Sequence, residues 1–276
     1  MDALQSLYKW SRDLKEDTKL PTLFMGHGSP MNAIEDNEFS RTWSKTANEI
    51  QKPKAVLVVS AHWLTYGTFI TAMENPKTIH DFGGFPPELY QVQYPAKGSP
   101  ELAQYTSEII TSTPVGLDHE WGLDHGTWSV VRHMYPNADI PVLQLSIDYN
   151  QPAQYHFDLS RQLASLRSKG VLIIGSGNMV HNLRMVAWDK LGETAYGFDW
   201  ANEMNAIFKD KISNGDFKSL IEYEKMGAAA KLAIPTPDHY YPLIYNIGLQ
   251  DKDDTVEFFN DKAVGGSLTM TSVKIG

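Results

Sequence analysis

The sequence of 276 residues contains no cysteine. A disulfide framework, a thiolate metal site and a cysteine nucleophile are therefore all excluded. Any metal that this chain binds must be held by nitrogen and oxygen ligands, which in proteins are chiefly histidine, aspartate and glutamate.

Long apolar segments and an excess of positive charge are absent as well. No apolar run approaches the roughly 18–20 residues that span a bilayer, and residues 1–17 lack the apolar core of a signal peptide. The 33 acidic residues outnumber the 24 lysines and arginines, and the net charge is −9. Since an acidic chain attracts neither nucleic acid nor an anionic membrane, we expect a cytoplasmic protein with neither as a partner.

Four short apolar runs that end in small or polar residues are typical of buried strands. The runs are 22–25, 55–60, 142–146 and 171–174. Helical patterns occupy the intervening segments 101–110, 152–169 and 198–211. This alternation predicts an α/β fold, with a mostly parallel or mixed central sheet flanked by helices. No linker interrupts the pattern, so we expect a single catalytic domain over residues 1–276, preceded at 1–19 by a helical extension.

The positions of the nine histidines carry the main functional signal. His27 follows the first predicted strand, His62 follows the second, and His181 comes shortly after the run at 171–174. Because ligands of open α/β sheets bind beyond the carboxyl ends of strands, these three side chains are expected to converge. His125 and His239 lie in segments rich in Gly, Pro and Trp, which we expect to be loops that approach the same place.

A single histidine near a strand end is more often a hydrogen-bonded filler than a ligand, but this joint pattern is hard to explain as filler. Imidazole is a common nitrogen ligand of Zn, Fe, Cu and Ni. The other four histidines have weaker contexts. His80 lies in an aromatic loop that could line a substrate pocket, His156 is expected on a solvated helix face, and His119 and His133 carry no functional expectation.

Six motifs occur in a fixed order between about residue 20 and the C-terminus. They are Gly26-His27-Gly28-Ser29-Pro30, Ser60-Ala61-His62-Trp63, Asp81-Phe82-Gly83-Gly84-Phe85-Pro86, Gly122-Leu123-Asp124-His125-Gly126-Thr127-Trp128, Gly175-Ser176-Gly177-Asn178 with His181-Asn182, and Thr236-Pro237-Asp238-His239-Tyr240. In this series the chain resembles a class III extradiol ring-cleavage dioxygenase of the LigB-like group, and most of all its 4,5-DOPA dioxygenase branch.

The resemblance implies an enzyme that opens catechol rings with O2 by means of one divalent metal per chain. That metal is non-haem Fe(II) for activity or Zn(II) as a bound form. By position, His27, His62 and His239 correspond to the metal ligands. His181 corresponds to an acid–base histidine that could also be a fourth ligand, and His125 to an acid–base residue that contacts substrate. The implied partners are a small catechol and O2, and the expected assembly is a monomer or a small homo-oligomer.

One feature departs from the wider superfamily, in which many members supply a glutamate as the third ligand. Here the corresponding residue is His239, and its neighbour Asp238 is the alternative ligand. Three histidines with an open position also form a catalytic zinc site. A zinc-dependent hydrolase therefore stays open as the alternative function, and a non-catalytic metal-binding protein is the third reading.

The chemistry of catechols gives roles to the remaining candidates. A catechol must lose protons to chelate a metal, so a base is needed nearby, and histidine can serve at neutral pH. His125 and His181 are the candidates for this proton transfer. Aromatic side chains near the motifs could enclose the substrate ring; these are Trp63, Phe82, Phe85, Trp128 and Tyr240.

Overall fold

In the computed structural model, residues 19–193 and 195–276 are described. The helical extension expected at 1–19 therefore lies, apart from Lys19, outside the described residues. Among the residues that are described, no helix combines the length and the apolar character needed to cross a membrane.

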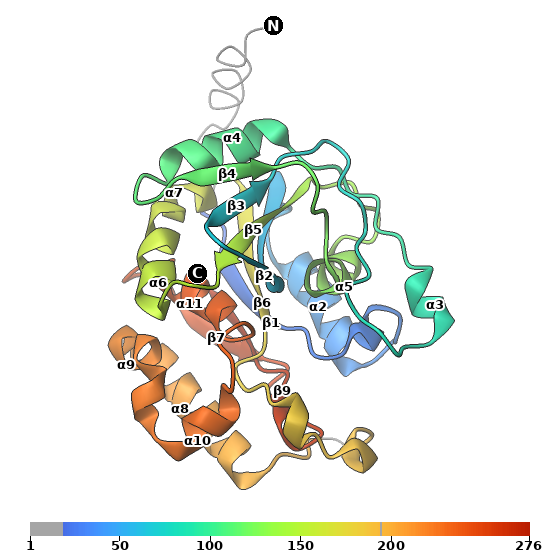
Figure 1. Cartoon of the computed structure of the whole chain (residues 1–276), viewed down its shortest axis with the longest axis vertical. Coiled ribbons are helices and arrows are strands. Elements are labelled where there is room, and N and C mark those ends of the chain that lie inside the picture. The colour runs from blue at the N-terminus through green and yellow to red at the C-terminus, as the bar shows by residue number, and fades with distance from the viewer. Residues whose placement is uncertain (1–18, 194) are drawn as a thin grey trace, which may run out of the picture.

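A single mixed sheet of eight strands forms the centre of the protein (Figure 1). In spatial order its strands are β4 (Val115–Asp118), β3 (Thr68–Thr71), β5 (Val142–Asp148), β2 (Ala55–Thr65), β6 (Val171–Gly177), β1 (Thr22–Gly26), β10 (Ser272–Ile275) and β7 (Val256–Phe259). The four middle strands β5, β2, β6 and β1 run parallel, whereas β3 pairs with β5, and β10 with β1 and β7, in antiparallel fashion. A separate ribbon pairs β8 (Ala263–Val264) with β9 (Leu268–Thr269). The predicted α/β class with a mixed sheet is confirmed.

The four apolar runs of the sequence are the four parallel strands. Each is buried on both faces, which explains why its sequence is continuously apolar instead of alternating. The largest difference concerns β2, which continues through His62 to Thr65, beyond its predicted end at residue 60. Its register against β5 shifts between Val59 and Leu64, as at a β-bulge, which re-aims the side chains around it.

Helices cover both faces of this sheet (Figure 1). They are α2 (Glu38–Glu49), α3 (Pro87–Tyr90), α4 (Pro100–Ile109), α5 (His125–Met134), α6 (Ala153–Gln162), α7 (Ala164–Arg167), α8 (Asp199–Ser213), α9 (Phe217–Ile221), α10 (Ala228–Ala233) and α11 (Tyr241–Gly248), with 3-10 turns η1 (Pro30–Ala33), η2 (Leu183–Met185), η3 (Trp188–Lys190) and η4 (Tyr223–Met226). The predicted helices at 101–110 and 198–211 are confirmed as α4 and α8. The helix predicted over 152–169 is present as two helices, α6 and α7, separated at Leu163.

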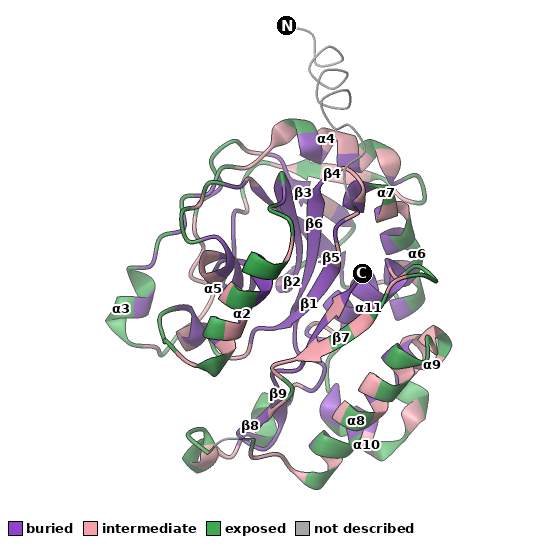
Figure 2. Cartoon of the chain, turned by 180° about the vertical axis from the view of Figure 1, so that it is seen from behind, coloured by how far each residue is buried: buried purple, intermediate pink, exposed green. Residues whose placement is uncertain are grey.

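Two hydrophobic cores lie on opposite sides of the sheet, which Figure 2 shows as a buried layer. Leu57 and Val59 belong to one core, together with residues of α4, α6, α8 and α11. Val56 and Val58 belong to the other, with Trp43 of α2 and residues of α5. The period-2 alternation of a strand thus sends successive side chains into different cores. Helix α5, which begins at His125, is fixed against the sheet by the second core.

A fully buried arginine ties the two ends of the described chain together. The guanidinium of Arg167 donates hydrogen bonds to the carbonyl oxygens of Leu20, Leu249 and Ile275, and it pairs with the carboxylate of Asp254 at 2.6 Å. Hydrogen bonds from Arg167 hold the pKa of Asp254 at about 2, although burial acts to raise it. All these partners are needed because an uncompensated charge in the interior is costly.

Replacing Arg167 by Ala should therefore cost about 3–5 kcal/mol of unfolding free energy, the range for breaking a buried ion pair. Urea denaturation measures this quantity. The control is Arg41→Ala, which removes an exposed ion pair to Asp36 and should cost no more than about 1 kcal/mol. Equal stabilities of the two variants would show that the Arg167 contacts contribute little.

Candidate metal centre

Five histidines from separate segments lie together at the carboxyl edge of the parallel strands. His27 directly follows β1, and His181 comes four residues after β6 ends at Gly177, as predicted. His62 lies within β2, in the segment between Val59 and Leu64 over which the register shifts. His125 is the first residue of α5, and the expectation of a loop there is wrong. His239 lies in the turn that precedes α11, as predicted.

The backbone around these residues is held by hydrogen bonds between strand ends. The amide of His27 donates to the carbonyl oxygen of Gly177, and the amide of Asn178 donates to that of His239. Two glycines in β6 permit this approach. A Cβ on Gly177 would lie 2.2 Å from the carbonyl oxygen of His239, and one on Gly175 would lie 2.4 Å from that of Pro242. The turn that carries His239 can therefore pack directly on β6.

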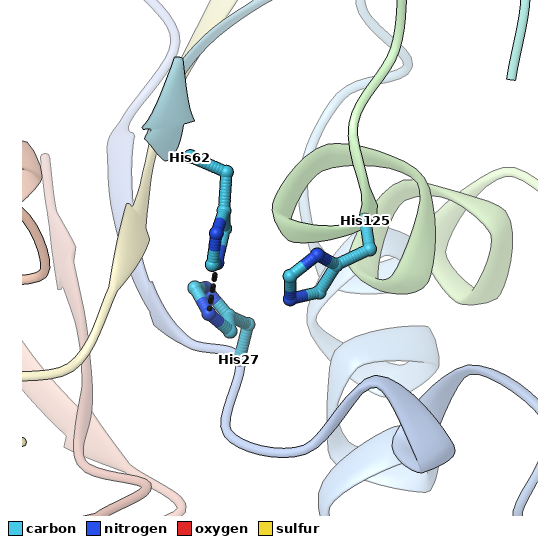
Figure 3. Close-up of side chains that lie close together, drawn as sticks. All are labelled: His27, His62 and His125. Atoms are coloured by element: carbon cyan, nitrogen blue, oxygen red, sulfur yellow. Dashed lines mark hydrogen bonds between the residues drawn. The ribbon is translucent and has the colours of Figure 1, made fainter. Parts of the chain in front are cut away.

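The rings of His27, His62 and His239 form a nearly regular triangle. Their centres lie 5.1 Å apart for His27 and His62, 5.3 Å for His27 and His239, and 5.0 Å for His62 and His239. The Nε2 atoms of His27 and His62 face each other at 3.2 Å (Figure 3). His125 approaches the same two rings from the start of α5 (Figure 3).

The usual geometry of imidazoles around a metal ion indicates which of these rings could bind the same ion. An imidazole whose nitrogen lies about 2.1 Å from a zinc ion has its ring centre about 3.2 Å from that ion. Two such rings at angles of about 90–110° have centres about 4.5–5.2 Å apart and nitrogens about 3.0–3.4 Å apart. The separations within the triangle of His27, His62 and His239, and the 3.2 Å between the two Nε2 atoms, agree with these values.

Two closer ring pairs do not agree with them. The rings of His62 and His125 have centres 3.8 Å apart, and those of His181 and His239 are stacked at 3.5 Å with an interplanar angle of 6°. Either pair would require an angle at the ion well below 90°. The in-plane lone pairs of these stacked rings also lie in two separate, nearly parallel planes, which opposes binding of one ion by both rings. The distances between ligand atoms divide the residues differently. His27, His62 and His125 form one group, and His181, Asp238 and His239 form another, with the ligand atoms of each group within 4.8 Å of one another. The triangle of rings takes two members from the first group and one from the second.

Each histidine of the triangle has a polar group near its Nδ1. The Nδ1 of His27 lies 2.9 Å from Ser176 Oγ, which itself donates to the carbonyl oxygen of Gly126 and therefore accepts from the ring. The Nδ1 of His239 contacts the carboxylate of Asp238. Such partners fix the tautomer and leave Nε2 free with its lone pair. Asp238, the alternative ligand of the sequence analysis, thus contacts Nδ1 of His239, the ring nitrogen opposite the one left free.

The carboxylate of Asp81 lies close to Nδ1 of two histidine rings. Its Oδ2 lies 2.9 Å from Nδ1 of His125 and 3.5 Å from Nδ1 of His62, and its Oδ1 accepts the backbone amide of His125 at 2.8 Å. Burial acts to raise the pKa of Asp81, but the hydrogen bonds from His125 outweigh it and hold this pKa below its ordinary value. Asp81 and Ser176 were not singled out from the sequence, although both lie within the ordered motifs.

Burial favours the neutral form of three of the clustered imidazoles, those of His27, His62 and His181. It lowers the pKa of His27 and of His62 well below the ordinary value, and the neighbouring histidines lower both further. Burial, with His239 close by, lowers the pKa of His181 to about 2. Because only the neutral ring has a lone pair to offer to a metal ion, the lowered pKa values of these three rings keep them available as ligands at neutral pH.

Of the five aromatic residues expected to enclose a substrate, two lie partly exposed beside the histidines. Phe82 stands edge-on to the ring of His125, with ring centres 5.5 Å apart, and Phe85 packs against Phe82. The other three are buried in other contacts. Trp63 stacks on Trp121, Trp128 donates its indole N–H to the carbonyl oxygen of Ile79, and Tyr240 donates its hydroxyl to that of Leu220.

The remaining histidines lie outside this cluster of five rings. His80 contacts the carbonyl oxygen of Val92 through Nε2, and its ring lies 5.9 Å from that of Phe82. The expectation that His156 is solvated is wrong. Its ring is fully buried between α6 and α11, with Nδ1 3.0 Å from the hydroxyl of Tyr245, and burial lowers its pKa to about 4.

Comparison with known proteins places these features in a family context. Residues 20–274 match the family model described as the catalytic LigB subunit of aromatic ring-opening dioxygenase. The chain is 47% identical to a "4,5-DOPA dioxygenase extradiol" of Escherichia coli (strain K12), over 95% of this chain and 97% of that protein. It is 37% identical to a protein of the same name from Beta vulgaris, over 94% and 97%.

A solved structure agrees with the fold. The crystal structure of an uncharacterized protein from Escherichia coli K12 superposes with a TM-score of 0.81 at 42% identity, and the match covers 93% of this chain and all of that one. The relatives named above are dioxygenases, so the zinc-hydrolase alternative receives no support.

The glycine of β6 below His239 provides a test of the architecture. Gly177→Ala places a methyl group against a backbone carbonyl that cannot rotate away, so we expect a loss of about 1–3 kcal/mol in stability and weaker zinc binding because His239 is displaced. Urea denaturation and a zinc titration measure the two effects. Gly192→Ala, where a Cβ meets no atom within 4 Å, is the control. Unchanged zinc affinity in Gly177→Ala would mean that His239 does not depend on this contact.

Proposed function

This chain belongs to the LigB family of aromatic ring-opening dioxygenases, and we propose that it opens the rings of DOPA-like catechols. It is an extradiol dioxygenase that uses O2. The substrate class rests on the names of the relatives from Escherichia coli and Beta vulgaris. Partly exposed aromatic rings beside His125 support it, because Phe82 and Phe85 offer faces and edges on which a catechol ring can pack.

We assign the metal ligands to His27, His62 and His239. The single observation that carries this assignment is the triangle of ring centres 5.0–5.3 Å apart, which corresponds to three imidazoles around one ion. The contacts of Ser176 and Asp238 support it, since they leave Nε2 of His27 and His239 as the free nitrogen. All three donors are neutral nitrogens, which suit both Fe(II) and Zn(II).

We propose one metal ion per chain, Fe(II) in the active enzyme and Zn(II) as a bound but inactive form. Bound Fe(II) supplies the redox chemistry that lets O2 react with an aromatic ring, and zinc has none to supply. The protein's own part is to hold the catechol against the histidine cluster and to take up its hydroxyl protons.

Proton transfer falls to His125 and His181. The ring of His125 is anchored at Nδ1 by Asp81, so its Nε2 is the nitrogen that can accept a proton from a substrate hydroxyl. His181 is the weaker candidate of the two, because burial beside the stacked ring of His239 lowers its pKa to about 2 and so opposes the uptake of a proton. A histidine that has gained a proton in this way can return it to the ring-opened product. The cytoplasmic location and the monomeric or small oligomeric state stay predictions from the sequence.

The ligand assignment predicts a clear division among single-alanine variants. His27→Ala, His62→Ala and His239→Ala should each lose most of the bound metal, because each removes one of three donors. His125→Ala and His181→Ala should retain it, since their rings lie too close to a neighbouring ring to share its ion. Elemental analysis after loading with zinc measures the occupancy.

His119→Ala, at an exposed position, is the control for the loading procedure. Full occupancy in His239→Ala together with loss in His125→Ala would move the third ligand to His125. Full occupancy in both variants would point to Asp238.

The reaction itself is tested by comparing the two metal forms. With Fe(II) and DOPA, the enzyme should consume one O2 for each catechol lost and form a coloured ring-opened product. The zinc form should be equally folded and should consume no O2. An oxygen electrode and absorbance spectra follow both quantities. An iron-loaded enzyme that consumes O2 with other catechols but not with DOPA would refute the substrate class, and one inactive with every catechol would refute the proposed function.

A further inference from the structure

Asp81 contacts the candidate acid–base histidine at two points. Its Oδ2 lies 2.9 Å from Nδ1 of the His125 ring, and its Oδ1 accepts the backbone amide of the same residue at 2.8 Å. That amide belongs to the first residue of α5, where backbone N–H groups have no partner within the helix. The carboxylate therefore fixes both the start of the helix and the orientation of the ring that projects from it.

These two contacts also decide which ring nitrogen of His125 carries the proton. A backbone amide can only donate, so Oδ1 is committed as an acceptor. Oδ2 is a carboxylate oxygen and accepts as well, so the proton of the neutral ring must lie on Nδ1. Nε2 then carries the lone pair, and the ring projects toward His27 and His62 (Figure 3). Only in this tautomer can His125 accept a proton from a substrate bound among these histidines.

The same oxygen faces a second ring. Oδ2 of Asp81 lies 3.5 Å from Nδ1 of His62, a distance at which the carboxylate still favours a proton on that nitrogen. In the sequence, Asp81 is separated from these two histidines by 19 and 44 positions. One carboxylate thus faces Nδ1 of both a proposed ligand and the proposed acid–base residue.

We propose that Asp81 is a positioning residue for ring opening, which acts by holding His125 in the tautomer with Nε2 unprotonated. The proposal deepens the function proposed above and rests on the role given there to His125. It assigns to Asp81 no contact with substrate or metal.

The substitution Asp81→Asn separates this role from simple packing. The amide has nearly the shape of the carboxylate but only one acceptor atom. That oxygen must stay with the backbone N–H of His125, because turning the amide would bring two donors together. The NH2 group then faces Nδ1 of the ring, which must become an acceptor. The proton moves to Nε2, and the nitrogen that faces the substrate can no longer take one up.

We therefore expect the iron-loaded Asp81→Asn enzyme to fold normally and to turn over ~10²–10⁴-fold more slowly, the range for loss of a general acid–base group. KM should change much less than kcat. In the zinc-loaded protein, 15N NMR of the histidine rings should show His125 protonated at Nε2 in the variant and at Nδ1 in the parent. Asp36→Asn, an exposed carboxamide variant of an aspartate paired with Arg41, should leave kcat and the ring signals unchanged.

Asp81 also faces His62, so a loss of bound metal is a competing explanation for slow turnover of Asp81→Asn. Measuring the metal content separates the two explanations. All rates are to be measured at saturating Fe(II), with occupancy determined on the same samples. If the rate of Asp81→Asn returns to the parent value once iron saturates, the residue supports metal binding only and the proposal is overturned. The same holds if the NMR signals show the parent tautomer of His125.

A double-mutant cycle with His125→Ala decides whether Asp81 acts through that ring. The proposal expects Asp81→Asn to cause little further loss in the His125→Ala background. Additive losses would overturn it. If His125→Ala itself turns over at the parent rate, the role given to His125 in the proposed function fails. If His125→Ala is slow and Asp81→Asn is not, only the inference about Asp81 fails.

Discussion

Packing five imidazoles against one another in a largely buried place is the constraint on which this site depends. Charged rings would repel at centre-to-centre distances of 3.5–5.7 Å, and burial adds a further cost to any positive charge. The rings of His27, His62 and His181 are accordingly held neutral. A neutral imidazole has one donor and one acceptor nitrogen, so each ring must also be given a direction. Ser176 provides it for His27, Asp238 for His239, and Asp81 for His125, in each case through a contact at Nδ1.

The fold meets this constraint by bringing rigid backbone to one edge of the sheet. The amide of His27 donates a hydrogen bond to the last residue of the neighbouring parallel strand β6, and His62 projects from the part of β2 over which the register shifts. Gly175 and Gly177 remove the side chains that would keep the His239 turn away from β6. The fourth segment that reaches the site is the start of α5, and the second hydrophobic core holds this helix against the sheet. Small displacements of these elements would separate the rings, so the site depends on the strand ends, the start of α5 and the turn packed on β6.

Much of this arrangement could be predicted from the sequence because the signals are local. Runs such as 171–174 are continuously apolar, which is what burial on both faces of a parallel sheet requires. The placement of His27 and His181 follows from the position of strand ends. The path of β2 past residue 60 could not be predicted, because a shift of register depends on the partner strand. The start of α5 at His125 had a local signal that was overlooked: Asp124 is its N-cap, with its carboxylate accepting the amide of Thr127.

Contacts between distant segments were the part that sequence reasoning could not reach. Ser176 meets a ring 149 positions away, and Asp81 meets one 44 positions away. His156 was placed on a solvated face because nothing local shows that α11 covers that side of α6 and sets Tyr245 against the ring. Periodicity identifies a polar residue on a helix, but whether another helix packs over it is decided by the tertiary fold.

The exchange of a carboxylate ligand for a histidine has a consequence for charge that the structure makes visible. The resemblance to the wider family leads one to expect a glutamate in place of His239, and a glutamate would bring a negative charge directly to the metal. In the ligand set proposed here the donors are neutral imidazoles, and the carboxylates lie on the other side of the rings. Asp238 contacts Nδ1 of His239, and Asp81 faces Nδ1 of His125 and of His62. A carboxylate on Nδ1 makes an imidazole a stronger donor without occupying a coordination position. With this ligand set, the two aspartates would place negative charge near a bound dication without themselves taking up coordination positions.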